Sequence, residues 1–322
     1  MSNSIVLATA PIDDYATAAL AEFGTLKIAP DIKEATIAGM MDGVVALVVR
    51  GAAPITAEVI DKAEALRVIG RTGVGYDTVD IEAATRRGIP VVYTPGAGAR
   101  AVAEATIGFM LALSKRMVFF DQQLKAGNWK SRYEMQGGDL DGKTLGIIGL
   151  GRIGSLVAAM AKPFDMTVIA YDPYLTPEEG FARGTRMVGL DDLLRQSDFI
   201  SMHCPMNPET KGMINRERLK LVKPGSYFVN LARGGVIENL DVIDEALRDG
   251  RFAGAALDVF DPSPPDTAHP LFMNANCLTS PHAIATTAGA MTRIFKSMSD
   301  DMVAILQGRA PKHVVNPEVL RR

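Results

Sequence analysis

The sequence predicts an α/β protein with two doubly wound parallel sheets. Apolar runs alternate with helical stretches in two separate series, one over the first hundred residues and one from 144 to about 279. Such alternation is typical of parallel strands joined by helices. A chain of 322 residues also exceeds the usual size of a single core, so we expect two domains.

The first series contains three predicted strands and three predicted helices. The strands are expected at 5–7, 43–49 and 68–70, and the helices at 16–23, 57–66 and 81–87. Thr56 and Asp80 directly precede two of these helices. Their side chains can accept hydrogen bonds from the first free backbone N–H groups, which supports both helix starts.

A long helix is predicted between the two series, from 100 to about 125. Apolar side chains lie nearly all round it, at Val102, Ala105, Ile107, Phe109, Met110, Leu111, Leu113, Val118, Phe119 and Phe120. A helix without a polar face is buried by its own chain or by a partner subunit.

The second series contains five predicted strands, at 144–149, 167–171, 198–202, 225–230 and 253–257, and a further short strand before Ser280. A final helix is expected from about 286 to 306. Its methionines, among them Met291, Met298 and Met302, recur near helical spacing, which is more typical of a core than of a cofactor site.

The turn after the strand 144–149 carries the most specific signal in the chain. Gly149, Gly151 and Gly154 form a G-x-G-x-x-G pattern that opens a predicted helix over 151–164. Such glycines allow a tight turn, the approach of a pyrophosphate, and close packing of helix on strand. Asp172 closes the next strand, where a carboxylate accepts from ribose hydroxyls and repels a 2′-phosphate. Together these features predict an NAD site rather than a merely structural turn.

Composition excludes several other classes. The net charge of −3 gives no sign of nucleic-acid binding, and no apolar run approaches membrane-spanning length. The start of the chain lacks the pattern of a secretory signal. The two cysteines, Cys204 and Cys277, have no metal-ligand spacing, so we expect free thiols, no metal site and a cytoplasmic protein.

Two residues suggest the chemistry. Arg233 follows the strand 225–230 in NLARGG, where it can offer a bidentate fork to a carboxylate, and Gly234 and Gly235 are expected to leave room for a ligand. His282 follows a short strand in LTSPH, at the carboxyl edge of the predicted sheet, where it can exchange a proton with a substrate hydroxyl. The alternative for His282 is a packed structural histidine.

The other histidines are less informative. His203 ends a strand at the expected nucleotide crevice, so it is either a cofactor contact or a packed histidine. His269 lies in a proline-rich loop with no partner in sight, and His313 is expected to be solvated.

With these residues placed, the sequence resembles the D-isomer-specific 2-hydroxyacid dehydrogenases, especially the phosphoglycerate dehydrogenase and hydroxypyruvate/glyoxylate reductase branch. The resemblance covers nearly the whole chain. Its marks are RTGVGYDTVD (71–80), VAE (102–104), GKTLGIIGLGRIG (142–154), HCPMNPET (203–210), NLARGGVI (230–237), GAALDVF (254–260), SPH (280–282) and VVNPEV (314–319).

The resemblance implies a role for each matching position. Arg233 and His282 match the catalytic arginine and histidine, and Val74 and Gly75 match the loop whose amides hold the substrate carboxylate. Cofactor contacts are implied, beside the three glycines, at Arg152, Ile153, Asp172, His203, Cys204, Pro205, Thr210, Ala232 and Asp258.

The family plan also implies a domain arrangement. A Rossmann NAD domain over 101–286 would be inserted into a flavodoxin-like substrate domain formed by 1–100 and 287–322. The helix from Arg100 would lie at a homodimer interface. Arg50 and Arg100 are candidates for binding the far end of the substrate, and the alternative for each is a surface cation.

One position departs from the family. The glutamate that pairs with the catalytic histidine is replaced by Ser263, and the nearby acids Asp261 and Asp266 do not fall at the matching position. Ala285 also stands where the family usually has glycine. We expect a dehydrogenase of small D-2-hydroxy acids or 2-oxo acids. The alternatives are an enzyme with altered chemistry or substrate and an NAD(H)-sensing binding protein, because the C-terminal-binding-protein corepressors resemble the same family.

Overall fold

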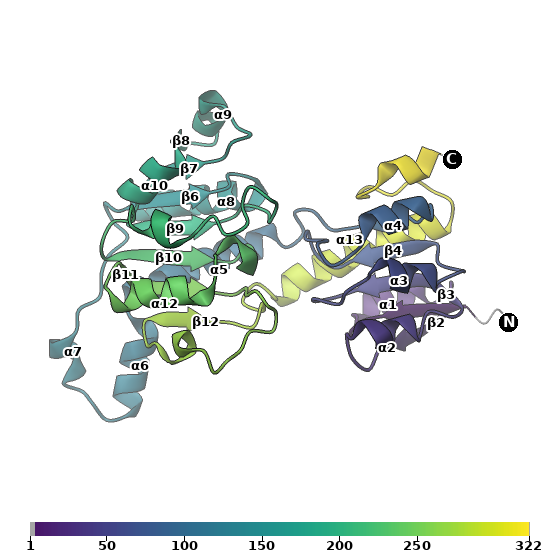
Figure 1. Ribbon diagram of the computed structural model, residues 1–322, viewed down its shortest axis with the longest axis horizontal. Helices are drawn as coiled ribbons and strands as arrows, with labels where there is room; N and C mark the ends of the chain where they lie inside the picture. Colours follow the sequence, from purple (N-terminus) through teal and green to yellow (C-terminus); the bar gives the residue numbers. More distant parts are fainter. Residues whose placement is uncertain (1–3, 322) are drawn as a thin grey trace. The chain divides into compact units, whose positions relative to one another are not determined.

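The computed structural model describes residues 4–321. The chain forms two compact units (Figure 1). The first unit runs to Gly98 and resumes at Thr287, and the second covers Ala99–Thr286. Both are parallel α/β sheets covered by helices on both faces, which confirms the predicted fold class.

The first unit contains a five-stranded sheet with the order β2-β1-β3-β4-β5. Its strands are β1 (Ile5–Ala8), β2 (Thr25–Ile28), β3 (Val44–Val49), β4 (Val68–Arg71) and β5 (Val91–Val92). One face packs against α1 (Asp14–Leu20) and α13 (Ala288–Leu306). The other packs against α2 (Glu34–Ala38), α3 (Ala57–Asp61) and α4 (Ile81–Arg86). This strand order is the flavodoxin-like one.

The second unit contains a seven-stranded sheet with the order β12-β11-β10-β9-β6-β7-β8. Its strands are β6 (Thr144–Ile148), β7 (Thr167–Tyr171), β8 (Arg186–Met187), β9 (Phe199–Met202), β10 (Ser226–Asn230), β11 (Phe252–Leu257) and β12 (Cys277–Thr279). The strand order reverses at β6, which pairs with both β7 and β9. In open α/β sheets, ligands bind outside the carboxyl ends of the strands at such a point.

Helices cover both faces of this second sheet. One face packs against α5 (Ala99–Ser114) and α8 (Arg152–Ala161), and the other against α10 (Leu190–Gln196), α11 (Arg216–Leu219) and α12 (Leu240–Arg248). The remaining α-helices are α6 (Met117–Lys125), α7 (Ser131–Glu134) and α9 (Pro177–Ala182). Short 3-10 helices occur at Lys162–Phe164, Gly234–Val236, Pro270–Met273 and Pro317–Arg321.

The predicted long helix is in fact two helices. Arg116 has a φ of 51°, so the chain turns there in a left-handed conformation that ends α5 and begins α6. Most residues of α5 are buried or half-buried, but Arg100, Glu104 and Gly108 lie exposed along one side, and no residue of α6 is buried. The expectation of one continuous helix was therefore wrong, whereas burial of α6 by a partner subunit stays a prediction.

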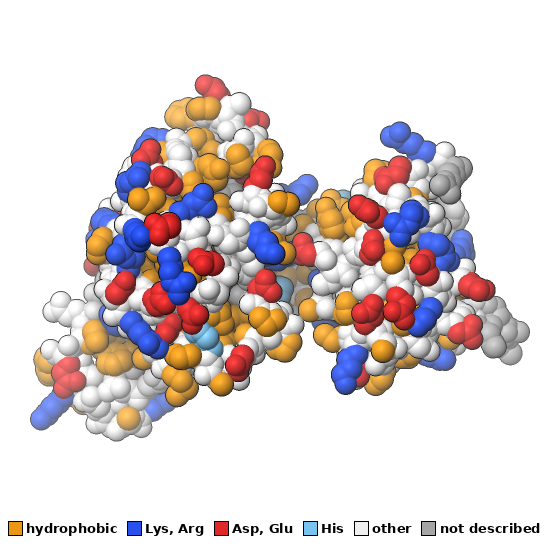
Figure 2. Space-filling model, in the orientation of Figure 1, with side chains coloured by type: hydrophobic (Ala, Val, Ile, Leu, Met, Phe, Trp, Pro, Cys, Tyr) orange, Lys and Arg blue, Asp and Glu red, His pale blue; other side chains and the backbone are white. Residues whose placement is uncertain are grey.

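The surface carries both charge signs. Basic and acidic side chains are interspersed on the face in view (Figure 2), in keeping with a net charge of −3. Within residues 4–321, no helix combines the length and apolar character needed to cross a bilayer.

Candidate active site

Three glycines build the turn between β6 and α8, and each solves a different steric problem. Gly149 has a φ of 93°, and a Cβ there would lie 2.6 Å from the backbone nitrogen of Cys204. A Cβ on Gly154 would lie 2.1 Å from the carbonyl oxygen of Gly149, so its absence lets α8 pack against the strand. At Gly151, by contrast, no atom beyond its chain neighbours lies within 4 Å of the Cβ position. The N-terminus of α8 therefore faces open space, as the binding of a pyrophosphate requires.

Asp172 lies beside this turn. Its Oδ2 accepts a hydrogen bond from the Leu150 amide at 2.9 Å, and its Oδ1 accepts from the Tyr174 amide at 3.0 Å. These bonds orient the carboxylate at the carboxyl end of β7, where it can also accept from ribose hydroxyls. Together with the open N-terminus of α8, this carboxylate shows that the residues present fit a bound NAD molecule.

The chain after β9 forms the opposite wall of the glycine turn, through its backbone. The His203 side chain bonds to the Ser201 hydroxyl (Nε2 to Oγ, 2.8 Å), and burial lowers its pKa to about 3. By its exposed surface His203 is half-buried, whereas Cys204 is buried, with its Sγ 3.9 Å from the sulfur of Met213, and burial raises the pKa of Cys204 to about 11. A neutral imidazole and a protonated thiol are thus packed behind the backbone that meets Gly149.

Thr210 stabilises the same loop from within. Its hydroxyl donates to the Pro205 carbonyl at 2.7 Å and accepts from the Asn207 amide at 2.9 Å. A second contact joins this loop to the one after β7, where the Tyr174 hydroxyl donates to Glu209 Oε2 at 2.9 Å. Sequence reasoning missed this pair, because the two residues are 35 positions apart and both are exposed.

Arg233 lies in a tight turn that an asparagine holds. Asn230 ends β10 and is fully buried. Its Nδ2 donates to the Arg233 carbonyl at 2.9 Å, and its Oδ1 accepts from the Ala232 amide at 3.0 Å. Arg233 itself donates through Nη1 to the Ala232 carbonyl at 2.7 Å. Asn230 was not among the predicted site residues, although asparagine commonly makes such turns at strand ends.

The two glycines after Arg233 do not leave room for a ligand, so that expectation was wrong. A Cβ on Gly234 would lie 2.1 Å from the carbonyl carbon of Phe260, and one on Gly235 would lie 2.5 Å from the sulfur of Met206. These glycines admit the segment that follows β11. The Asp261 carboxylate comes within 3.0 Å of the Gly235 Cβ position, so this acid lies against the turn after Arg233.

Asp258 fixes the loop that carries His282. This aspartate is buried, and its Oδ1 accepts from the amides of Ala283 at 3.0 Å and Ile284 at 3.3 Å. His282 is exposed and has a φ of 56°, a left-handed conformation that is uncommon outside glycine. The loop thus presents an imidazole at the carboxyl edge of β12, on the same sheet as the glycine turn.

Ser263 is exposed and makes no hydrogen bond to any other residue within 4–321. Of the two acids near it, Asp266 accepts from the Ala268 amide at 2.9 Å and so closes its own turn. Asp261, by contrast, lies against the turn after Arg233.

In the first unit, the loop after β4 offers free amides. Gly73 has a φ of 131°, and its amide donates to the Thr94 hydroxyl at 2.9 Å, which anchors the loop. The amides of Val74 and Gly75 donate to no other described residue, and the Val74 side chain is exposed. Two neighbouring free N–H groups suit a carboxylate.

Arg50 and Arg100 are both engaged already. Arg50 donates through Nη1 to the Pro11 carbonyl, and its guanidinium lies 5.1 Å from the centre of the Phe295 ring. Desolvation lowers the pKa of Arg50. Arg100 pairs with Glu104 one turn along α5, at 2.9 Å, and both side chains are exposed.

The two remaining histidines have partners, contrary to expectation. His269 Nε2 lies 3.0 Å from Asp241 Oδ1, and its Nδ1 accepts from the Leu271 amide at 3.1 Å. His313 Nδ1 lies 3.0 Å from Asp301 Oδ2. Both acids come from helices distant in sequence, so local reasoning could not find them.

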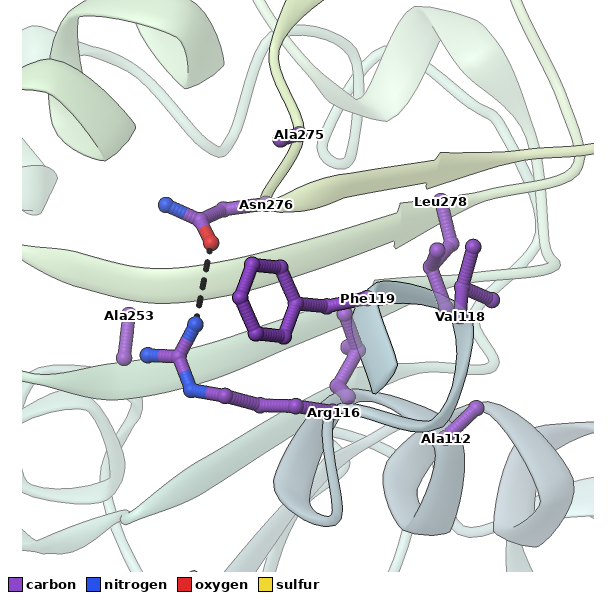
Figure 3. Close-up of a pocket in the computed structure, with 9 residues that line it drawn as sticks. Ala112, Arg116, Val118, Phe119, Ala253, Ala275, Asn276 and Leu278 are labelled. Atoms are coloured by element: carbon purple, nitrogen blue, oxygen red, sulfur yellow. Dashed lines mark hydrogen bonds between the residues drawn. The ribbon is translucent and has the colours of Figure 1, made fainter. Parts of the chain in front are cut away.

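A small cavity lies at the amino ends of the strands of the second sheet, opposite the carboxyl ends where the glycine turn lies. Figure 3 shows its lining, in which Arg116 reaches Asn276 (Nη1 to Oδ1, 3.3 Å) beside Phe119. Ala253 and Asn276 stand at the amino ends of β11 and β12. The volume of about 30 Å³ admits only a few water molecules. The cavity is therefore not a substrate site.

Comparisons with known proteins point to one family. A family model described as the NAD binding domain of D-isomer specific 2-hydroxyacid dehydrogenase matches residues 107–283, more than half of the chain. The D-3-phosphoglycerate dehydrogenase of Methanocaldococcus jannaschii is 39% identical over 312 residues, which make up 97% of this chain and 59% of that protein. The chain spans little more than half the length of the curated relatives it matches, between 51% and 59%.

Two solved structures are similar over almost their whole length. A protein of Thermus thermophilus is 35% identical, covers 97% of this chain and 99% of its own, and has a TM-score of 0.90. The D-lactate dehydrogenase of Aquifex aeolicus, solved with NAD and lactic acid, is 29% identical with the same coverage and a TM-score of 0.88.

Proposed function

Because the chain belongs to the D-isomer specific 2-hydroxyacid dehydrogenase family, we propose that it is an NAD-dependent oxidoreductase acting on small D-2-hydroxy acids or 2-oxo acids. Its substrate is of the hydroxypyruvate, glyoxylate or phosphoglycerate type. The second unit is the NAD domain, with proposed bounds 101–286, and residues 1–100 with 287–322 form the substrate domain.

One observation carries this proposal. Arg233, His282 and the glycine turn of Gly149, Gly151 and Gly154 all follow carboxyl ends of strands in the same parallel sheet. A carboxylate clamp and a proton donor at the edge where a dinucleotide binds are the parts that a 2-hydroxy acid dehydrogenase needs.

We propose the following roles. The Arg233 guanidinium holds the substrate carboxylate in a bidentate pair. In the first unit, the free amides of Val74 and Gly75 are proposed substrate contacts. His282 donates a proton to the C2 oxygen during reduction and accepts it during oxidation. Bound NAD supplies the hydride chemistry. Asn230 and Asp258 keep Arg233 and His282 in position through the bonds described above.

We propose that the predicted cofactor residues act in three ways, through their side chains, through their backbone, or through the loop that they stabilise. Asp172 and the N-terminus of α8, with Arg152 and Ile153, would bind ribose and pyrophosphate. The NAD site would be lined by Pro205 and Ala232 and by the backbone of His203 and Cys204. The side chains of His203 and Cys204 contact Ser201 and Met213 instead. Thr210 would act through the loop it stabilises.

Arg50 remains the candidate for the far end of the substrate. Only Nη1 of its guanidinium is used as a donor among the described residues, so four of its five N–H donors remain. Arg100 is the weaker candidate, because Glu104 already neutralises it.

The test is a screen of NADH oxidation with glyoxylate, hydroxypyruvate, phosphohydroxypyruvate, sulfopyruvate and branched 2-oxo acids. Turnover of at least one acid is expected, with the D-hydroxy acid as product. Binding of NADH without turnover of any of these acids would instead favour the alternative, an NAD(H)-sensing binding protein. The named relatives are dehydrogenases, which argues against that alternative.

We also propose that the protein is a homodimer. Figure 1 shows α6 and α7 extending away from the sheet of the second unit. The segment exposes large apolar side chains, at Met117, Val118, Leu124, Trp129 and Tyr133. Apolar side chains gathered on one projecting segment favour burial against another chain, and a two-fold pair is the commonest solution.

Sedimentation analysis tests this association. We expect a dimer at micromolar concentration, and Leu124→Asp should shift it toward the monomer without changing the melting of the second unit. Tyr174→Ser, which alters an exposed side chain outside the segment, is the matched control. A wild-type monomer at all concentrations would contradict the proposal.

The location is proposed to be cytoplasmic. Cys204 and Cys277 are free, and burial raises the pKa of Cys277 to about 12. Unpaired thiols suit a reducing compartment. Cell fractionation with an antibody to the chain tests this directly.

A further inference from the structure

The polar face of α13 forms a cavity with the tail that follows the helix. The helix residues recur at helical spacing, and the tail contributes two more, giving a lining of Arg293, Lys296, Ser297, Asp300, Asp301, Lys312 and His313. The opposite face of α13 packs into the first sheet through Phe295, Met298 and Met302. The cavity measures about 260 Å³, just below the usual range for small-molecule sites.

A buried carboxylate fixes the tail against the helix. Asp301 is 3% exposed, and it accepts three hydrogen bonds from the tail. Its Oδ1 accepts from the Lys312 amide at 2.6 Å, and its Oδ2 accepts from the His313 amide at 3.2 Å and from His313 Nδ1 at 3.0 Å. The walls of the cavity are therefore tied together by a satisfied polar contact, in which two backbone amides and the His313 ring face the Asp301 carboxylate.

The other acid of the lining, Asp300, is paired with a cation. Asp300 pairs with Lys296 at 3.2 Å and accepts from the Tyr15 hydroxyl at 2.6 Å. The Lys296 ammonium also contacts that hydroxyl at 2.7 Å and lies over the Tyr15 ring. These groups therefore satisfy one another on one side of the cavity.

Two cations and a hydroxyl remain. Arg293 and Lys312 form no ion pair with any residue within 4–321. Arg293 uses only its Nε, which donates to the Ala97 carbonyl at 3.1 Å, so the forked end of its guanidinium keeps its donors. Ser297 lies one helical turn from Arg293, and its hydroxyl makes no hydrogen bond to another described residue.

We propose that this cavity binds a phosphate group through Arg293, Ser297 and Lys312. A guanidinium fork, a hydroxyl and an ammonium from two segments line the same cavity, and phosphate oxygens accept hydrogen bonds from all three kinds of donor. The volume is large enough for inorganic phosphate or a small phosphate monoester. The site lies wholly within the first unit, and it shares no residue with the proposed active site.

The experiment is calorimetric titration of the full chain with inorganic phosphate, sulfate and glycerol phosphate, at constant ionic strength set with chloride. We expect saturable binding, weakened about tenfold by Arg293→Gln and by Lys312→Gln, because each removes a charge-assisted hydrogen bond. Ser297→Ala should weaken binding less. Tighter binding of glycerol phosphate than of inorganic phosphate would identify a phosphorylated small molecule as the ligand, and the reverse would identify free phosphate.

Matched controls separate this site from other anion contacts. Arg86→Gln and Lys33→Gln remove exposed cations of the same unit that do not line the cavity, and they should bind phosphate like wild type. Arg233→Lys should also keep the binding, which distinguishes the cavity from the proposed substrate clamp. Equal affinity of wild type, Arg293→Gln and Lys312→Gln, or no saturable binding to wild type, would overturn the proposal.

Discussion

Replacing Gly154 by alanine should destabilise the second unit, whereas the same change at Gly151 should impair only cofactor binding. A Cβ at position 154 would lie 2.1 Å from the Gly149 carbonyl oxygen. Helix α8 would have to move by about 1 Å or more to restore an ordinary contact, because interiors are close-packed. Overpacking of this kind costs about 3 kcal/mol at the upper end of its usual range. At roughly 2–4 °C per kcal/mol, the unit should melt roughly 6–12 °C lower.

Gly151 gives the matched comparison. Its φ of −75° is open to any residue, and no atom beyond its chain neighbours lies near the added methyl group. Folding stability should therefore change by less than about 1 kcal/mol. The methyl group would project into the space in front of α8, where the pyrophosphate binds. We expect the dissociation constant for NADH to rise at least tenfold, or about 1.4 kcal/mol.

Two measurements decide between these effects. Scanning calorimetry of the three proteins gives the melting of the second unit, and fluorescence titration gives the affinity for NADH. Unchanged melting of Gly154→Ala would refute the packing argument. Unchanged NADH affinity of Gly151→Ala would show that the pyrophosphate does not approach the N-terminus of α8.

Four further outcomes are expected. Asp172 should make NADH a better cofactor than NADPH, and comparable kcat/KM values with both would contradict its proposed role. Arg233→Lys keeps the charge but loses the fork, so turnover should fall by orders of magnitude while NADH affinity, measured by titration, changes little. Ser263→Glu should move the alkaline limb of the pH profile of reduction to higher pH, since a carboxylate beside His282 stabilises the protonated imidazole. The measurement is kcat/KM for reduction as a function of pH. An unmoved limb would mean that another acid already stabilises the imidazolium or that His282 is not the proton donor. Because burial lowers the pKa of His203 to about 3, the stability that the neutral imidazole contributes is present above pH 6.5 and is lost as the pH falls toward 3. Denaturant unfolding of wild type and His203→Gln at pH 7 and pH 5 should therefore show a smaller drop in the free energy of unfolding for the variant.

The main strands could be predicted because they are continuous apolar runs, and the missed ones lack that signal. β5 and β8 contain two residues each, and three of the four residues of β2 are exposed. Such short strands form because a neighbouring strand of the sheet offers its backbone groups for hydrogen bonding. The break at Arg116 was equally invisible, because a left-handed arginine leaves no mark in an apolar helical pattern.

Site residues could be predicted from the sequence only where the side chain itself indicates a chemical role. Glycines, a carboxylate, an arginine and a histidine at strand ends are recognisable by themselves. The roles of Gly234 and Gly235 were misjudged because their neighbours, Phe260, Asp261 and Met206, are more than 20 residues away in the sequence. Asn230 was missed for a similar reason, since its importance lies in the turn that it closes rather than in its own chemistry.

The loop that carries His282 is held in place without Ser263. The backbone after His282 is held by Asp258, which accepts from the amides of Ala283 and Ile284, and Ser263 takes no part in these bonds. We therefore expect the position of the imidazole to depend on Asp258, and its charge to respond to a carboxylate introduced at position 263. A change at 263 can alter the pH range of proton transfer while leaving the left-handed His282 in place. For this reason Ser263→Glu is expected to shift the pH profile rather than to disturb the fold, whereas loss of the Asp258 carboxylate should displace the loop and reduce turnover at every pH.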